Sequence, residues 1–378
     1  MTTTAAPRAV DQELLGAFLG RMIGDVGATV SAALVVIGDR LGLYRAMADG
    51  RPVTAEDLAA RTGTSVAYLR PWLANQAAGG YVDYHPRAVP LPTPGPPDGA
   101  EDHNPEFGTF SMTAEQAYAL ADQDSPAFFP GSMQLAIGVV RDLAPIEDRF
   151  RTGAGFGWHE HDADLFTGTE RFFRPGYVGN LVGTWLPALD GVVGKLTAGA
   201  AVADVGCGHG ASTILMAQAF PASTFLGTDY HEGSIVVARR RAEAAGVADR
   251  VRFETADATD LPGGRYDLIT MFDCLHDMGD PVAAAGAARR ALAPDGTFMA
   301  VEPMAGDHLE DNLHPLGRVF YGASTLVCTP CSLAQPGGAA LGPQAGPARL
   351  TALLIDAGFG RARVACTSPV NLVLEARP

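Results

Sequence analysis

The first apolar residues of the chain recur at helical spacing and predict a long helix over residues 11–47. Gly38 and Gly42 are the points at which this helix could break, because glycine weakens a helix interior. So much apolar surface on an early helix would pack either on another subunit or on its own domain. The residues that set the pattern are Leu14, Leu15, Phe18, Leu19, Met22 and Ile23, followed by an apolar stretch over 30–43.

A compact unit of two short helices and a strand follows. Thr54 suits the N-cap of a helix over 54–61, and a Thr-Gly-Thr turn leads into a second helix over 65–78. An alternating strand over 81–84 comes next. Because helix, tight turn, helix and strand are the outline of a winged helix, we expect residues 11–88 to form a winged-helix-like dimerisation domain.

Proline and glycine then interrupt the pattern. Residues 86–106 are rich in proline, glycine and acidic residues, which predicts a linker or long loop. From 107 the pattern is mainly helical, with breaks at prolines and glycines. We expect 107–192 to be a helical connector that covers a pocket as a lid.

From residue 196 onward, apolar strands alternate with helices, which predicts a parallel sheet covered on both faces. A helix over 347–357 is followed by two strands that are joined by a short turn and must be antiparallel. The expected fold class of 196–378 is α/β: a doubly wound, mostly parallel, seven-stranded sheet with a terminal antiparallel hairpin. The predicted strands are 200–205, 222–229, 250–255, 266–272, 296–302, 361–367 and 370–376, and the helices between the first five are 211–219, 233–246 and 281–292.

Composition and charge narrow the function classes. The chain of 378 residues has a formal net charge of −15, which disfavours binding to a phosphate backbone. Residues 51–85 hold three arginines against three acidic residues, so the winged helix lacks the basic surface of a DNA reader. The five cysteines are scattered, the first residues lack the pattern of a signal peptide, and the longest apolar stretch, 28–37, is too short to span a bilayer. We expect a cytoplasmic protein without a nucleic-acid or membrane partner.

A glycine-rich turn after the first strand of this sheet is the sharpest local signal. Asp204 stands near the end of the strand, and Gly206, Gly208 and Gly210 let a ligand approach the backbone closely. Gly206-x-Gly208-x-x-Ala211 also matches the dinucleotide fingerprint, so a nicotinamide enzyme is an alternative. Asp204 would face a pyrophosphate unfavourably, however, whereas it would attract an ammonium group.

Two further strands end in acids. Asp229 closes the second strand, where a carboxylate can accept both ribose hydroxyls, and Asp257 follows the third, where it can accept from an adenine amine. With Asp204, these residues and the terminal hairpin form a combination that chance rarely supplies.

These motifs resemble those of the class I S-adenosylmethionine-dependent methyltransferases over about 196–376. They are DVGCGHG, GTDYH, ETADA and YDLITMFDCLHD. The whole chain is similar to a bacterial group with an N-terminal winged helix, through GWHEHDADLFTGTERFFRPGY, FDCLHDMGDP and NLHPLGRVFYGASTLVC, and plant-type small-molecule O-methyltransferases share its layout. The resemblance implies S-adenosyl-L-methionine as cofactor, a small-molecule methyl acceptor and a homodimer. The expected cofactor-binding residues are Asp204, Gly206, Gly208, Gly210, Asp229, Tyr230, Asp257, Ala258, Phe272, Asp273, Tyr177 and Trp158.

Catalysis is expected after the fourth strand. His276 stands there, at the cofactor's reactive end, and an imidazole suits a general base. Glu302, at the end of the fifth strand, could orient His276 and stabilise its charged form. Plant-type O-methyltransferases hold their catalytic histidine at the same place in an H-D-W-x-D pattern, in which Met278 here replaces the tryptophan. We expect methyl transfer to oxygen.

Other chemistries remain open. Some bacterial relatives methylate α-keto acids at carbon with a metal held by two histidines, but the stretch 324–328 has no second histidine, and Cys328-x-x-Cys331 alone is a weak metal signal. We therefore expect no metal. His159 and His161, two positions apart after Trp158, favour a covering loop over the cofactor. A transcriptional regulator that uses its methyltransferase fold as a ligand sensor is the remaining alternative.

Overall fold

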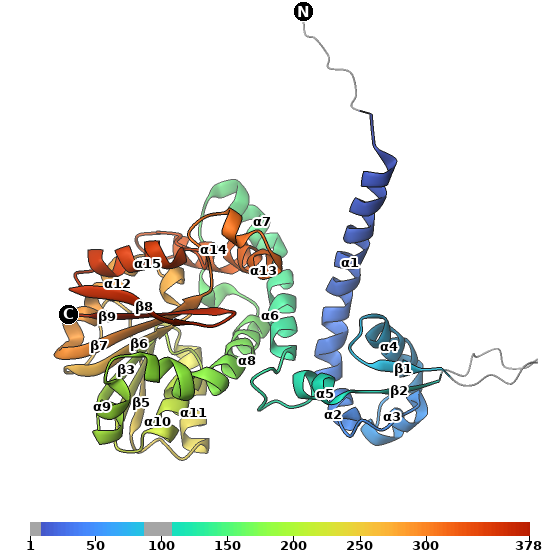
Figure 1. Ribbon diagram of the computed structural model, residues 1–378, viewed down its shortest axis with the longest axis horizontal. Helices are drawn as coiled ribbons and strands as arrows, with labels where there is room; N and C mark the ends of the chain where they lie inside the picture. Colours follow the sequence, from blue (N-terminus) through green and yellow to red (C-terminus); the bar gives the residue numbers. More distant parts are fainter. Residues whose placement is uncertain (1–8, 87–107) are drawn as a thin grey trace, which may run out of the picture. The chain divides into compact units, whose positions relative to one another are not determined.

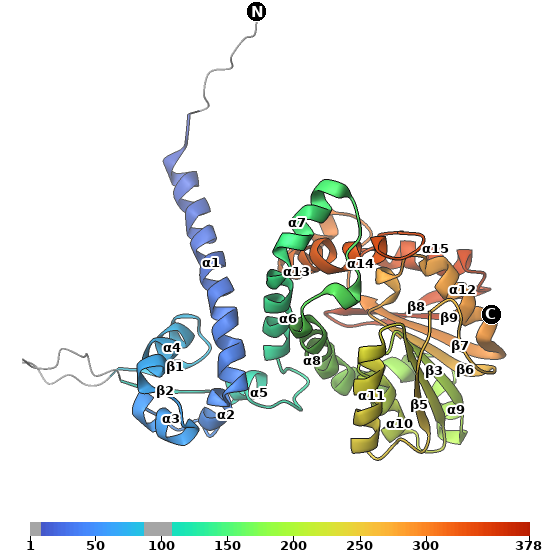
Figure 2. The same cartoon turned by 180° about the vertical axis from the view of Figure 1, so that it is seen from behind.

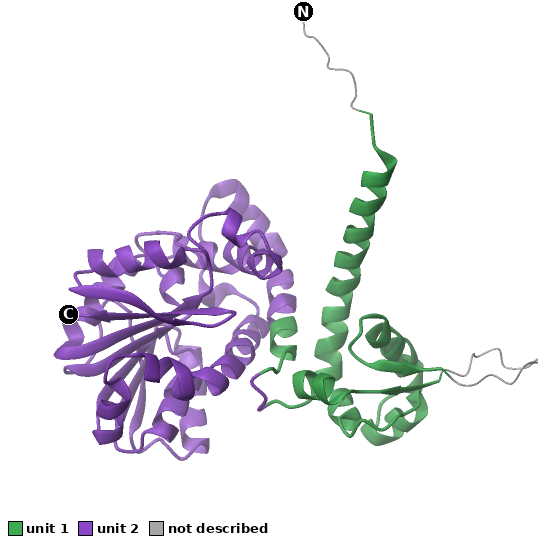
Figure 3. Cartoon of the chain, in the orientation of Figure 1, with its two compact units in different colours: residues 1–123, 127–134 green, residues 124–126, 135–378 purple. Residues whose placement is uncertain are grey.

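The computed structural model describes residues 9–86 and 108–378, and the chain divides into two compact units (Figure 3). The first contains the residues up to 123 together with 127–134, and the second contains 124–126 and 135–378. The predicted linker over 86–106 lies, apart from its first residue, outside the described residues. The residues of the predicted connector over 107–192 are shared between the two units.

The first unit consists of helices and one two-stranded sheet. Its long predicted helix ends at Arg40, and Gly42 takes the left-handed conformation (φ 71°) at the break. The strand over 109–111 was not predicted, because the sequence from 107 was interpreted as helical. The elements are α1 (Gln12–Arg40), α2 (Leu43–Met47), α3 (Ala55–Thr62), α4 (Val66–Ala78), β1 (Asp83–His85), β2 (Thr109–Ser111) and α5 (Ala114–Leu120), with α6 (Pro130–Arg141) beginning in this unit.

Local sequence signals explain these elements. Thr54 and Asp57 form a capping box at the start of α3, each side chain accepting from the other's backbone N–H. Gly38 does not break α1: a Cβ there would lie 2.5 Å from the Trp72 ring, so glycine lets α4 approach closely. The only lysine or arginine on α4, Arg70, is paired with Glu56 at 2.8 Å. This helix therefore offers little to a phosphate backbone.

The exposed part of α1 is apolar. Its C-terminal half contributes Val35 to the core of the unit, whereas Leu14 is 69% exposed and Ile23 is 73% exposed. Over its most apolar part the mean hydropathy is 1.5, so α1 is long and apolar enough to cross a membrane by length and composition. That criterion is also met by helices that pack on protein.

The second unit is a seven-stranded sheet with helices on both faces, in the order β5-β4-β3-β6-β7-β9-β8. The first five strands are parallel, and β9 runs antiparallel to both neighbours. The predicted fold class is confirmed. The strands are β3 (Ala201–Val205), β4 (Thr224–Asp229), β5 (Val251–Thr255), β6 (Tyr266–Phe272), β7 (Leu292–Pro303), β8 (Arg361–Thr367) and β9 (Asn371–Arg377).

Two hydrophobic cores lie on the two faces of this sheet (Figure 1). Alternate strand residues point to opposite cores, as Val202 and Ala203 do on β3. Helices α9, α10 and α11 cover one face, and α12 and α15 cover the other; Figure 2 shows the arrangement from behind. These helices are α9 (Val192–Ala198), α10 (Ala211–Ala219), α11 (Glu232–Ala244), α12 (Pro281–Ala291) and α15 (Gly346–Asp356).

The second unit contains further helices and short turns. Of these, the run over 315–333 was not predicted from the sequence. They are α7 (Leu143–Thr152), α8 (Ala163–Asn180), α13 (Pro315–Ala323) and α14 (Thr329–Leu333); π-turns at Leu181–Trp185 and Ser324–Cys328; and 3-10 turns at Trp158–Glu160, Leu186–Ala188, Leu275–Asp277 and Glu310–Asn312.

Candidate active site

The glycine turn between β3 and α10 has the backbone that the sequence predicted. Gly206, Gly208 and Gly210 all have positive φ, at 71°, 52° and 79°. A Cβ at Gly206 would lie 2.7 Å from the Cys274 sulfur, whereas none of the described atoms lies within 4 Å of the corresponding position at Gly208. The turn therefore packs tightly on one side and leaves its Gly208 backbone open to a ligand.

Asp204 lies beneath this turn and is 1% exposed. Its carboxylate accepts hydrogen bonds from three hydroxyls, and burial raises its pKa although these bonds lower it. Sequence analysis did not single out these hydroxyls, although two of them directly follow the glycine turn. The donors are Ser212 Oγ at 2.7 Å, Thr213 Oγ1 at 2.6 Å and Thr270 Oγ1 at 2.9 Å.

Asp229 joins the glycine turn to the end of β4. One carboxylate oxygen accepts from the Gly208 N–H at 2.9 Å, and the other accepts from the His231 N–H at 2.8 Å. Burial raises the pKa of this carboxyl group, while the two bonds lower it. Asp229 thus holds the open part of the turn in place.

The other predicted residues on this side are more accessible. Asp257 is exposed, and its Oδ1 accepts from the backbone N–H and the hydroxyl of Thr259 at 2.8 and 2.6 Å. Ala258 is partly buried against the core. The Tyr230 side chain is 46% exposed, and partial burial raises the pKa of its hydroxyl.

Asp273 follows β6 in a strained conformation, with φ 51° in a residue other than glycine. Its carboxylate accepts from Tyr177 Oη of α8 at 3.3 Å and from Asn371 Nδ2 of β9 at 3.2 Å. Burial and the neighbouring Glu302 raise the pKa of Asp273 well above its usual value. The Tyr177 and Phe272 rings lie 5.2 Å apart, so α8 reaches the predicted cofactor side of the strand ends.

The segment of residues 155–161, here the covering segment, reaches the loop after β4. Trp158 lies 5.2 Å from the Phe166 ring, which in turn lies 5.0 Å from the His231 ring. His161 is buried and held by Asp142 at 2.7 Å. Phe166 and His231 were not predicted as site residues, although His231 ends the GTDYH motif and Phe166 lies within the GWHEHDADLFTGTERFFRPGY motif.

Three of the predicted carboxylates, at positions 204, 229 and 273, are brought together. Burial and mutual repulsion raise the pKa of Asp204, and Asp229 contributes to that repulsion. Among the described residues, none of the three forms an ion pair with lysine or arginine. Buried and half-buried acids that no lysine or arginine pairs with, beside an open glycine backbone, fit a ligand that carries positive charge.

His276 lies on the turn after β6 and is 3% exposed. Its Nδ1 bonds to Glu302 Oε2, and its Nε2 lies 3.2 Å from Asp277 Oδ1. Burial alone lowers the pKa of this imidazole, but the charges of Asp277 and Glu302 outweigh burial and raise it well above its usual value. The pairing of His276 with Glu302 that the sequence suggested is therefore present.

Two family models match the chain. Residues 196–338 match the model described as a methyltransferase domain, and residues 29–93 match the Rv2258c-like winged HTH domain. The chain carries a methyltransferase domain. The predicted order, a winged helix followed by a methyltransferase domain, is confirmed.

Several curated proteins match part of this chain. The 27-O-demethylrifamycin SV methyltransferase of Amycolatopsis mediterranei is 36% identical over 118 residues, which are 29% of this chain and 43% of that protein. The demethylmenaquinone methyltransferase of Thermus thermophilus is 32% identical over 103 residues, 27% of this chain and 46% of that protein. The chain thus spans less than half the length of these relatives.

Solved structures match the fold along nearly the whole chain. Human N-acetylserotonin methyltransferase, in complex with SAM, matches with a TM-score of 0.66 and 17% identity, covering 98% of this chain and 99% of that one. The mitomycin 7-O-methyltransferase MmcR matches with a TM-score of 0.62 and 20% identity, covering 97% of this chain and 100% of that one. This chain therefore shares its fold, over both of its units, with these proteins.

Proposed function

We propose that this protein transfers a methyl group from S-adenosyl-L-methionine to oxygen on a small organic acceptor. The observation that carries the proposal is the group of Asp204, Asp229 and Asp273 around the open glycine backbone. A sulfonium and an ammonium group on one ligand would supply the positive charge that no lysine or arginine supplies to these acids. The names of the similar proteins, which include N-acetylserotonin, mitomycin and rifamycin methyltransferases, favour a small hydroxyl-bearing acceptor.

The residues present fit this cofactor. We expect the Gly208 backbone and Asp273 to hold its amino-acid end, Asp229 its ribose hydroxyls and Asp257 its adenine amine. Tyr230, Ala258 and Phe272 would line the nucleoside. When bound, the cofactor supplies an electrophilic methyl group and leaves as S-adenosylhomocysteine.

The protein's own groups position the acceptor and handle its proton. Tyr177 is fixed against Asp273 and Phe272, and Trp158 packs in the covering segment, so both can exclude water from the reacting groups. His276 is the proposed general base. Glu302, bonded to its Nδ1, orients the ring and stabilises the imidazolium that forms when His276 Nε2 takes the acceptor's proton. Because Asp277 already faces Nε2, the approaching hydroxyl must displace or share that contact.

The wider assignments belong to the same proposal. The protein would act as a cytoplasmic homodimer, with 11–88 for dimerisation and 107–192 covering the pocket, and without nucleic-acid or membrane partners. The acidic net charge supports the absence of nucleic acid, and so does the pairing of Arg70 with Glu56.

Calorimetry with S-adenosylhomocysteine tests the cofactor assignment. We expect stoichiometric binding by the wild type, a loss of tenfold or more in Asp229→Ala and a smaller loss in Asp257→Ala, whose side chain is exposed and supports little structure. Glu243→Ala, an exposed acid at the other end of α11, should bind like the wild type. No binding by the wild type, or tighter binding of NADH than of S-adenosylhomocysteine, would refute the assignment.

His276→Ala tests the base. Turnover should fall by about a hundredfold or more while affinity for S-adenosylhomocysteine stays within a factor of a few, because proton removal contributes about 10²–10⁴ in rate. The exposed His308→Ala is the matched control. Full activity in His276→Ala would show that another group activates the acceptor.

A further inference from the structure

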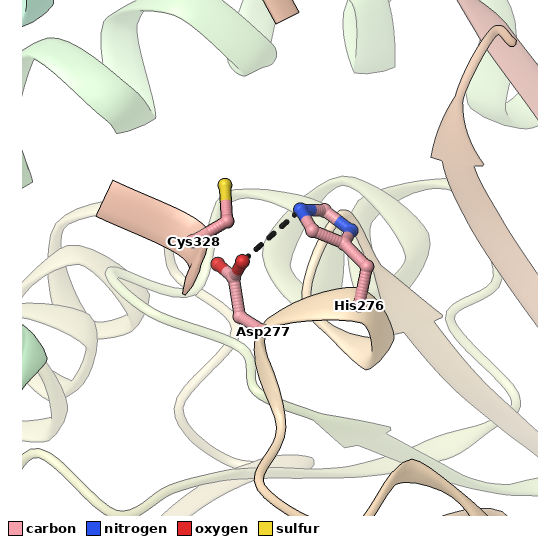
Figure 4. A group of neighbouring side chains, drawn as sticks. All are labelled: His276, Asp277 and Cys328. Carbon is pink, nitrogen blue, oxygen red and sulfur yellow. Dashed lines mark ion pairs between the residues drawn. The ribbon is translucent and has the colours of Figure 1, made fainter. Parts of the chain in front are cut away.

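His276 also belongs to a cluster of side chains that could hold a metal ion. One ligand atom from each of His276, Asp277 and Cys328 lies within 4.8 Å of the other two (Figure 4). His276 and Asp277 are adjacent on the turn after β6, whereas Cys328 ends the π-turn that precedes α14. Figure 4 shows the thiol and the imidazole extending toward the same side of the Asp277 carboxylate.

The His276 and Asp277 atoms are spaced as two ligands of one ion would be, and the Cys328 sulfur lies within 4.8 Å of both. His276 Nε2 and Asp277 Oδ1 lie 3.2 Å apart, close to the roughly 3.3 Å that separates two nitrogen or oxygen ligands of a tetrahedral zinc ion. Asp277 Oδ1 is buried and accepts no hydrogen bond from any described residue. Its contact with His276 Nε2 is an ion pair rather than an aligned hydrogen bond, so a cation bound in front of both atoms would compensate the burial of this oxygen better.

The surrounding bonds hold the three side chains in place. Glu302 bonds to His276 Nδ1 and accepts from the Leu275 N–H at 3.1 Å, which directs Nε2 toward the cluster. A carboxylate on the far nitrogen of a histidine is the usual outer support of a zinc ligand. On the other side, Gln335 Nε2 donates to the Asp277 carbonyl at 2.9 Å, and Ser332 Oγ donates to the Met278 carbonyl at 2.8 Å. These two hydrogen bonds hold the α14 region against the turn that carries His276 and Asp277.

We propose that His276 Nε2, Asp277 Oδ1 and Cys328 Sγ bind one divalent zinc ion and leave its fourth position open. Thiolate and imidazole together favour zinc over magnesium or calcium, which prefer oxygen ligands. Three protein ligands with an open position are the arrangement of catalytic rather than structural zinc sites. The open position would accept water or an oxygen of the acceptor, and zinc would lower the pKa of that oxygen.

The proposal revises the role of His276, since a zinc ligand at Nε2 cannot also take a proton there. It also differs from our expectation of no metal, which rested on the lack of a second histidine in 324–328. Cys328, at the end of that stretch, supplies the missing ligand as a thiolate.

Metal binding can be measured without turnover. Metal-free, reduced protein is titrated with Co²⁺, a spectroscopic substitute for zinc, and then with Zn²⁺ in competition with a chromophoric chelator. We expect one ion per chain, a thiolate-to-cobalt charge-transfer band and tetrahedral d–d bands, with Mg²⁺ failing to compete. Cys328→Ser should abolish the charge-transfer band and weaken zinc binding by tenfold or more, and Glu302→Gln should weaken it by about 10–100-fold.

Cys331→Ser is the matched control, because Cys331 is buried three residues further on with its sulfur 3.7 Å from His161 Nε2. It should keep both the band and the affinity. No stoichiometric zinc, a charge-transfer band that survives in Cys328→Ser, or its loss in Cys331→Ser would overturn the assignment. Calorimetry with S-adenosylhomocysteine on the same samples separates the two proposals, because cofactor binding does not require these three ligands.

Discussion

Asp204 and Asp229 show how one kind of side chain serves two tasks in the candidate site. Both oxygens of Asp204 are committed to hydroxyls inside the protein, so this residue mainly fixes the strand and the helix around the glycine turn. Asp229 is partly accessible and bonds to backbone N–H groups, which leaves lone pairs for a ligand. An acidic residue at the end of a strand can therefore serve either purpose: Asp204 supports the protein fold, and Asp229 can reach the cofactor.

His209, between two glycines of the turn, makes the stability of the fold depend on pH. Burial, together with nearby positive charge, lowers its pKa to about 4, and its Nδ1 is buried without a partner among the described residues. The unfolded chain takes up a proton near pH 6.5 and the folded chain does not, so stability is lost as the pH falls from about 6.5 toward 4. The charged groups around it are Arg240, Arg241 and His231, which lower its pKa, and Glu170, which raises it.

We therefore expect the wild type to lose roughly 1 kcal/mol more unfolding free energy between pH 7.5 and pH 5 than His209→Gln, allowing for screening of a partly exposed ring. Urea unfolding at both pH values measures the difference. His308→Gln, on an exposed histidine, should behave like the wild type. Equal losses in the wild type and His209→Gln would contradict the expected role of His209.

Residues of the site differ in how far the sequence predicts them. Asp204, Asp229, His276 and Glu302 stand at strand ends, and strand ends can be located from a short apolar run. Asn371 bonds to Asp273 across 98 positions and Cys328 faces His276 across 52, so no local pattern links them. Such pairs depend on strand order and on how a distant helix packs, which spacing does not encode.

At the scale of elements, the covering segment depends on one glycine. A Cβ at Gly155 would lie 2.1 Å from the backbone nitrogen of Ala334, next to the hydrogen bond from the Phe156 N–H to the Pro330 carbonyl at 2.9 Å. Only glycine lets this segment lie against the end of α14. The position of Trp158 therefore follows from a backbone contact rather than from its own side chain.

Gly155→Ala should destabilise the protein by about 1–3 kcal/mol, because the methyl group has no room and backbone must move. Gly194→Ala, at an exposed position of α9 with no described neighbour near the added methyl, should instead be neutral or stabilise by up to about 1 kcal/mol. Chemical denaturation compares the two. Unchanged stability in Gly155→Ala would mean that the segment is free to shift.

The elements themselves were largely predictable where periodicity is strong. All seven strands of the large sheet were located because each is a short apolar run between helices with clear turns. The strand β2 was not, since three residues are too few to show alternation beside a helical pattern. The run α13–α14 was also not predicted, because its π-turn interrupts helical spacing and prolines stand at its helix starts.

At the scale of the whole molecule, the apolar surface of α1 suggests an assembly. The helix presents a row of exposed apolar residues to solvent, and its charged residues, Glu13, Arg21, Asp25, Asp39 and Arg40, sum to −1. A membrane-surface helix would instead be rich in lysine and arginine on its polar face. A second copy of the chain is therefore the expected cover for this surface.

Light scattering during size exclusion should accordingly show a dimer at micromolar concentration. Phe18→Glu combined with Met22→Glu places charge on successive turns of one helical face and should produce monomers. Tyr68→Glu, on an aromatic residue of α4 that is even more exposed, should leave the dimer intact. A monomeric wild type, or wild-type protein that floats with anionic vesicles, would contradict this expectation.

Trp158, in the covering segment, also gives the protein its own optical signal. The chain has three tryptophans, of which Trp185 is buried beside Phe272, while Trp72 belongs to the core of the other unit. The fluorescence of Trp158 would thus respond first to a bound nucleoside or to a shift of the covering segment. The fluorescence of Trp185, which is buried, would report changes inside the protein. Ligand titrations could be followed by intrinsic fluorescence. Replacing Trp72 by phenylalanine would lower the background fluorescence without changing a residue of the candidate site.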